Sequence, residues 1–117
     1  LPWPAPKLDL VKSGPLTFTD PDAQRFPALA IAKQALGAGG RAPGVMNAAN
    51  EGAVAAFLDR RIGFLDIARV VAETLDRMDR LGLVHSASDD VLEAAQMTDA
   101  TARHVADEIV AGLMARA

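Results

Sequence analysis

The chain has 117 residues, of which 50% are hydrophobic, and it carries a net charge of −3 with no cysteine. This length fits one domain. The weak negative charge excludes a basic surface for nucleic acid or anionic lipid, and the absence of cysteine excludes disulfides and thiolate zinc sites. No apolar run reaches the roughly 18 residues of a membrane span. We therefore expect a helix-rich cytoplasmic protein with neither a nucleic-acid nor a membrane partner.

The first residues, Leu1-Pro2-Trp3-Pro4, contain no initiator Met and none of the basic and apolar regions of a signal peptide. We therefore expect the chain to be cut from a longer protein. Trp3 has two interpretations. It is either an anchor that packs onto an absent domain or part of a disordered end.

An extended tail is predicted for the first part of the chain, because prolines disfavour helix there. Residues 8–11 and 16–19 alternate between apolar and polar side chains, which is typical of half-buried strands. No other segment indicates a strand convincingly. The two segments should therefore pair with a second copy of the molecule or complete a sheet that is missing here. The prolines are Pro2, Pro4, Pro6 and Pro15.

After Asp20 the apolar spacing becomes helical. Pro27 suits a first helical position, and Gly37 suits the C-cap of this first helix. A second helix is predicted from Val45 to about Arg60. Asn47 would cap its start, and Glu51 would lie favourably in its first turns.

The third helix is predicted over residues 65–80, with apolar side chains at i, i+3 and i+4. Ser88 or Asp89 would cap a short turn over residues 91–92, and Thr98 or Asp99 would open a final helix. Short connections between amphipathic helices favour antiparallel neighbours. The predicted fold class is thus all-α: a small antiparallel four-helix bundle, preceded by an extended, strand-forming N-terminal tail.

Most candidate chemical groups have a simpler structural interpretation. The glycines of residues 37–40 do not follow a strand, as a dinucleotide loop would, so we expect a helix cap and connection. The two histidines are far apart in sequence and should be solvated. Ser13-Gly14 lacks a nucleophile elbow. Two carboxylate pairs also fit a solvated surface better than a metal or acid–base site: Asp76 with Asp79, and Asp89 with Asp90. The histidines are His85 and His104.

The most unusual short stretch begins the predicted second helix. Its two amides and one carboxylate would either bind a polar ligand or cap the helix and hydrogen-bond to a neighbouring loop. We favour the structural role, because capping already occupies these groups. The stretch is Asn47-Ala48-Ala49-Asn50-Glu51.

Several segments also form a recognisable series in order and spacing. They are Trp3-Pro4, Leu8-Asp9-Leu10, Leu16-Thr17-Phe18, Pro21-Asp22, Arg25-Phe26-Pro27, residues 47–51, residues 53–58, and Ile62-Gly63-Phe64-Leu65-Asp66-Ile67. This series resembles the linker and C-terminal helical domain of the 1-deoxy-D-xylulose 5-phosphate reductoisomerase family. The chain departs from the family pattern after Lys12, where Ser13-Gly14-Pro15 replaces Leu-Ser, and at Gly52, where a larger aliphatic residue is common.

The resemblance implies an enzyme of non-mevalonate isoprenoid biosynthesis. That family converts 1-deoxy-D-xylulose 5-phosphate to 2-C-methyl-D-erythritol 4-phosphate with NADPH and a divalent metal such as magnesium or manganese. Its members are homodimers with a nucleotide domain, a central catalytic domain and a C-terminal bundle. None of the family's nucleotide, metal or substrate-phosphate residues matches a position here. We therefore expect no catalytic, cofactor or metal residue in this chain.

The resemblance divides the chain into residues 1–26, a linker and strand segment of the missing central domain, and residues 27–117, the helical-bundle domain. The remainder of the parent enzyme is the expected partner, and the chain alone should be inactive. Two alternatives stay open. In the first, the chain is a free-standing helical interaction module. In the second, it is a bundle that binds a small ligand around Asn47, Asn50 and Glu51.

Overall fold

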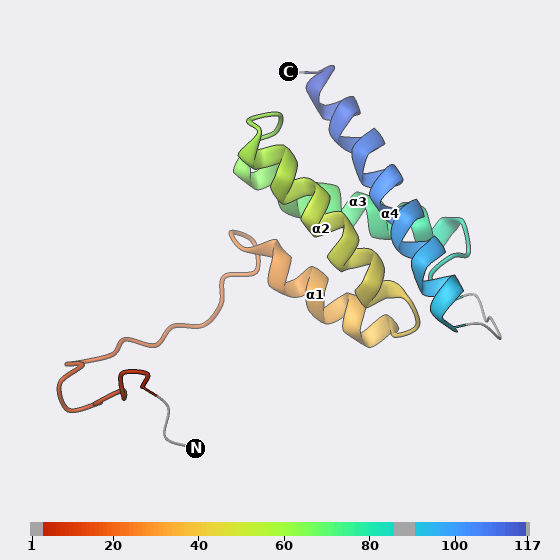
Figure 1. The fold of residues 1–117 in the computed structure, drawn as a ribbon. Coiled ribbons are helices and arrows are strands. Elements are labelled where there is room, and N and C mark those ends of the chain that lie inside the picture. The colour runs from red at the N-terminus through yellow and green to blue at the C-terminus, as the bar shows by residue number, and fades with distance from the viewer. Residues whose placement is uncertain (1–3, 86–90, 117) are drawn as a thin grey trace.

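The structure is a computed structural model that describes residues 4–85 and 91–116. These residues form an all-helical bundle, and a tail without helix or strand leads into it (Figure 1). The predicted all-α class and the number of helices are confirmed. The helices are α1 (Pro27–Ala38), α2 (Ala42–Leu58), α3 (Phe64–Arg80) and α4 (Val91–Met114).

The bundle has a three-helix centre with one helix outside it. Helices α2, α3 and α4 all pack against one another, whereas α1 packs on α2 and α3 and, within the described parts of the chain, not on α4. Figure 1 shows α2 running back along α1, and α4 running in the same general direction as α2. In the described ranges, no helix combines the length and the apolar character needed to cross a bilayer.

Glycines shape the connection between α1 and α2. The backbone N–H of Gly39, at φ 66°, donates to the carbonyl oxygen of Ala35 at 3.2 Å and so caps α1. The predicted helix cap in this cluster is therefore confirmed, but it is Gly39 rather than Gly37. A Cβ on Gly40 would lie 2.7 Å from the carbonyl oxygen of Val84. The glycine thus lets the segment after α3 lie directly against the start of α2.

Helix α2 begins earlier than predicted, at Ala42 instead of Val45, with Pro43 in its first turn. Proline is favourable there because the first turn has no intrahelical partner for its N–H groups. Asn47 consequently lies in the second turn, too far along the helix to be its N-cap. The predicted capping role of Asn47 is wrong.

Helix α4 is one continuous element from Val91 to Met114. The predicted start at Thr98 or Asp99 is wrong, because both residues lie inside the helix. The hydroxyl of Thr98 donates to the carbonyl oxygen of Ala94, one turn earlier, at 2.7 Å. A threonine hydroxyl that bonds within the helix in this way does not cap it. The predicted caps Ser88 and Asp89 lie outside the described residues.

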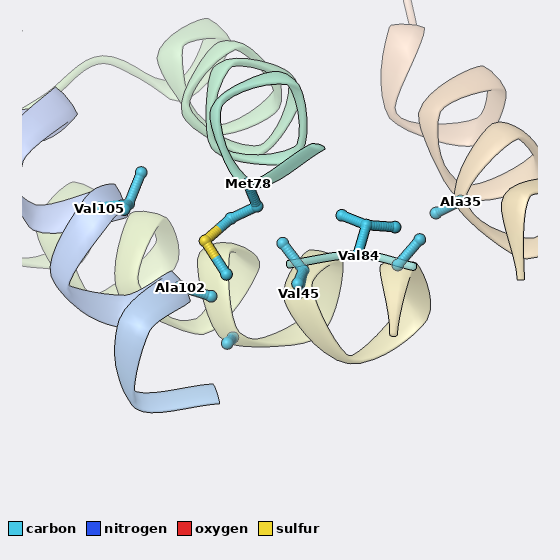
Figure 2. Packing of buried hydrophobic residues seen from close by; sticks show 8 residues of the cluster. Ala35, Val45, Met78, Val84, Ala102 and Val105 are labelled. Atoms are coloured by element: carbon cyan, nitrogen blue, oxygen red, sulfur yellow. The ribbon is translucent and has the colours of Figure 1, made fainter. Parts of the chain in front are cut away.

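The core is built from small and aliphatic side chains. Met78 of α3 is completely buried, and Figure 2 shows it reaching between Val45 of α2 and Ala102 of α4. Helices α2 and α4 approach closely, since a Cβ on Gly52 would lie 3.8 Å from the Cβ of Ala106. Small residues at this interface replace the aromatic side chains that fill many other cores.

The tail lies exposed in this structure. The first predicted strand, residues 8–11, is instead interrupted by a turn in which the carbonyl oxygen of Asp9 accepts the N–H groups of Lys12 and Ser13, each at 3.1 Å. The Asp9 carboxylate also accepts the N–H of Val11 at 3.1 Å. Residues 16–19 have no regular secondary structure. Aspartate side chains stabilise such turns locally, which explains this conformation in the absence of a partner strand. Trp3 lies outside the described residues.

Candidate functional site

The most connected polar group in the described structure joins α2 to α4. We call it the Arg103 cluster: Asn47, Glu51, Asp99 and Arg103. The Arg103 Nη2 donates to Glu51 Oε2 at 2.7 Å, and its Nε donates to Asp99 Oδ2 at 2.8 Å. The Asn47 amide completes the cluster by donating to Glu51 Oε1 at 3.0 Å. One guanidinium thus holds carboxylates from two helices.

The charges of the Arg103 cluster stabilise one another's ionised forms. The pKa of Arg103 is raised by its hydrogen bonds to Asp99 and then to Glu51. The pKa of Glu51 is lowered by the hydrogen bond from Arg103 and next by that from Asn47. These side chains are roughly half exposed, so water screens the ion pairs. A carboxylate held ionised in this way is a poor general acid, and the cluster is suited to joining helices.

Asn50 does not belong to the Arg103 cluster. It lines an apolar hollow of about 200 Å³ on another side of α2, between α1 and α3. The structure therefore brings Asn47 and Glu51 together and places Asn50 elsewhere. A single polar-ligand site built from all three residues is not formed. The other lining residues are Ala28, Ile31, Ala32, Met46, Ile67, Ala68 and Val71.

A larger hollow of about 390 Å³ lies where the start of α2 faces the start of α4. Arg41 lies at its wall and donates from Nη1 to Thr98 Oγ1 at 3.3 Å. The sequence analysis missed this pair, because 57 positions separate the two residues and no local pattern connects them. The lining that the structure describes offers one cation, one carboxylate and the Thr98 hydroxyl, which donates within α4. Its residues are Gly40, Arg41, Gly44, Val91, Ala95, Thr98 and Asp99.

Both histidines lie at the surface, as predicted, and each is near a carboxylate. The His85 Nε2 lies 3.6 Å from Asp79 Oδ1, and the His104 Nε2 lies 3.3 Å from Glu108 Oε1. Asp76 also lines the shallow hollow that contains Asp79 and His85. Both pairs are open to solvent, and Glu108 is also held by Arg77, whose Nη2 lies 2.8 Å from Glu108 Oε2.

The described residues include no group of metal ligands and no strand before the glycine-rich segment. Across residues 4–85 and 91–116, no three His, Cys, Asp or Glu side chains gather closely enough to hold a metal ion. The glycines of residues 37–40 form the connection from α1 to α2, in which Gly39 caps α1 and Gly40 lies against the segment after α3. The Ser13 hydroxyl donates to the carbonyl oxygen of Asp9 at 2.9 Å and serves a turn. Asp89 and Asp90 lie outside the described residues.

Comparisons with known proteins identify the family to which the chain belongs. The family model described as the DXP reductoisomerase C-terminal domain matches residues 1–105. The 1-deoxy-D-xylulose 5-phosphate reductoisomerase of Caulobacter vibrioides is 60% identical over 117 residues, which is 100% of this chain and 29% of that protein. The enzyme of the same name from Rhodospirillum centenum is 53% identical over 108 residues, 92% of this chain and 25% of that protein.

A solved structure gives the same assignment. The 1-deoxy-D-xylulose 5-phosphate reductoisomerase from Zymomonas mobilis in complex with NADPH superposes with a TM-score of 0.78 at 44% identity, covering 94% of this chain and 28% of that one. The chain thus spans less than a third of the length of the relatives it matches. It belongs to the DXP reductoisomerase C-terminal domain family.

Proposed function

We propose that this chain is the C-terminal structural part of an enzyme that converts 1-deoxy-D-xylulose 5-phosphate to 2-C-methyl-D-erythritol 4-phosphate. The 60% identity to the C. vibrioides enzyme over the whole chain is the main support. In this proposal, residues 27–117 form the helical-bundle domain, and residues 1–26 belong with the central domain. The complete enzyme is a cytoplasmic homodimer that uses NADPH and magnesium or manganese.

The role that we assign to the bundle is to brace the catalytic body of the enzyme. The single observation that carries this role is the Arg103 cluster, in which the polar groups of α2 are engaged with α4. Glu51 and Asp99 both bind Arg103, and Asn47 binds Glu51. These hydrogen bonds join α2 to α4 and engage the carboxylates of Glu51 and Asp99 within the bundle. We therefore assign NADPH binding, metal binding and the chemical steps to parts of the enzyme that this chain does not contain.

The tail is proposed to complete a sheet in the central domain. Its apolar side chains are exposed here, including Val11 and Phe18, which is 87% exposed. An exposed apolar segment with unpaired backbone groups is suited to adding to a sheet edge. In the complete enzyme, the turn at Asp9 would open so that residues 8–11 and 16–19 pair as strands. The hydrogen bonds that hold the turn are local and exposed to solvent, so hydrogen bonds to a sheet edge can replace them.

A segment exchange in the C. vibrioides enzyme tests the proposed function. One protein lacks the C-terminal segment that matches this chain, and a second carries this chain in its place. The rate of NADPH oxidation with 1-deoxy-D-xylulose 5-phosphate is then measured for both proteins and for the isolated chain. We expect the shortened enzyme to be inactive, the exchanged enzyme to be active, and the isolated chain to show no turnover. Turnover by the isolated chain would contradict the structural role, and an inactive but folded exchanged enzyme would contradict the family function.

A further inference from the structure

Helix α1 leaves large apolar side chains exposed to solvent although it belongs to a helical bundle. Its one buried residue is Ala35 and its Ile31 is partly buried, whereas both of its leucines face solvent. Leu29 is 46% exposed and Leu36 is 75% exposed. These two residues are seven positions apart, so they lie on one face of the helix, with Phe26 at the helix start close to that face. We call this surface the outer face of α1: Phe26, Leu29 and Leu36.

The inner side of α1 is built mainly from alanines, together with Ile31. Ala28, Ile31 and Ala32 line the apolar hollow against α2 and α3, and Ala35 reaches the core. The helix therefore turns its alanines and Ile31 inward and its two leucines outward. A helix that is apolar on both sides is normally buried on both sides. Within the described residues α1 packs only on α2 and α3, so no other helix covers its outer face, although the Arg25 guanidinium lies 5.6 Å from the centre of the Phe26 ring.

The tail before α1 also carries exposed apolar side chains. Leu16 and Phe18 are exposed and lie between the start of the chain and the outer face. Figure 1 shows the tail leaving the bundle at the first turn of α1. In the family, this segment is the C-terminal domain, and more than two thirds of the C. vibrioides relative lies outside the matched part. The body of the enzyme is therefore joined to the bundle through the tail and α1.

We propose that the outer face of α1 docks onto the body of the reductoisomerase that precedes the tail. This inference rests on the proposed function and specifies which surface of the bundle contacts the rest of the enzyme. The partner surface is apolar. It also offers a carboxylate or another acceptor near Lys33, the one charged residue of α1, which falls between Leu29 and Leu36 on the same face.

A second exposed apolar group serves as the comparison. It lies at the corner between α2 and α3 and consists of Leu58, Phe64 and Leu65. This corner is partly satisfied within the chain, because the Phe64 ring packs edge-on against Phe57 with centroids 5.8 Å apart. It is also not continuous in sequence with the tail. The outer face of α1 is therefore the better docking surface.

Hydrogen exchange and thermal unfolding test the docking in the enzyme that carries this chain in place of its own C-terminal segment. Amide exchange in α1 should be about tenfold slower there than in the isolated chain, because docking prevents local opening. The double substitution Leu29→Glu and Leu36→Glu should remove this difference and lower the Tm of the full-length enzyme by several degrees. The matched control, Leu58→Glu with Leu65→Glu, should do neither.

The isolated chain separates docking from folding. Both double variants should keep its Tm, since all four side chains are exposed. If the α1 variant unfolds the isolated chain, Leu36→Glu alone repeats the test at the more exposed position. Equal α1 exchange in the two contexts would overturn the proposal, as would an effect confined to the corner variant. A concentration-dependent dimer of the isolated chain that Leu36→Glu dissociates would identify a second copy as the occupant. Neither readout depends on turnover, so loss of activity alone counts against the proposed function and not against this surface.

Discussion

Arg103 of α4 donates a hydrogen bond of 2.7 Å to Glu51 of α2, although 52 positions separate the two residues in the chain. The same guanidinium holds Asp99, one turn earlier on its own helix. This contact converts the polar side of α2 into a link to α4. It explains why a stretch that resembles a ligand site in the sequence is engaged within the bundle.

Arg103→Met should lower the Tm of the chain, because it removes the link between α2 and α4 while keeping most of the alkyl stem. The matched control is Arg69→Met, since Arg69 binds Glu73 one turn away on the same helix at 2.7 Å. A link within one helix constrains less of the fold than a link between two. Thermal unfolding followed by circular dichroism should show the larger loss for Arg103→Met, and added salt should reduce the difference. Equal losses would assign no special role to the link between helices.

Glu51 should make the stability of the chain depend on acid. Its pKa is lowered from the ordinary value of 4.5 in the folded chain, first by the hydrogen bond from Arg103. The stabilisation is therefore fully present above 4.5 and is lost as the pH falls through the lowered pKa. Urea unfolding of the wild-type chain and Glu51→Gln should differ at about pH 6 and converge toward about pH 3. Asp107→Asn, at an exposed position of α4 outside the Arg103 cluster, is the control for removing one carboxylate from this helix.

Gly52→Ala should stabilise the chain by about 0.5–1 kcal/mol, because alanine restricts the unfolded chain and favours helix. The new Cβ would lie 3.8 Å from Ala106, an ordinary contact. Gly40→Ala should have the opposite sign and cost more than about 1 kcal/mol. There the φ is 53° and the Cβ would meet the carbonyl oxygen of Val84. Urea midpoints of the two variants provide the comparison, and a destabilising Gly52→Ala would mean that α2 and α4 lie closer than the structure shows.

Met78→Ala should destabilise the chain by about 2–5 kcal/mol, because it empties the completely buried site between α2, α3 and α4. Met97→Ala is the control. Its side chain is mostly exposed on α4, so its effect should stay within about 0.5 kcal/mol. If Met78→Ala prevents folding, Met78→Leu conserves the volume and should cost less than about 1.5 kcal/mol. A small loss for Met78→Ala in urea unfolding would show that the core collapses around the vacated volume.

Local patterns in the sequence predicted the four helices correctly but misplaced some of their ends. The apolar spacing placed α3 within one residue of its observed start, where Asp66 accepts the N–H of Gly63 at 2.9 Å. The starts of α2 and α4 were misplaced for a common reason. Asn47 and Thr98 are residue types that either cap a helix or bond within it, and their sequence neighbours do not distinguish these uses. Residues 8–11 and 16–19 form no strand in this structure, and their pairing with a sheet of the central domain remains a proposal.

The sequence by itself determined the all-α class, the four helices, the glycine connection after α1 and the resemblance to a reductoisomerase family. All of these depend on periodicity or on motifs read along the chain. Only the tertiary structure decided that Arg103 binds Glu51, that Asn50 faces away from both, and that Arg41 meets Thr98. The two contacts join positions more than fifty residues apart in the chain. The placement of Asn50 puts it on a different face of α2 from its sequence neighbour Glu51. The cause is the packing of small side chains between α2 and α4, which sets the distance at which the polar groups of the two helices meet.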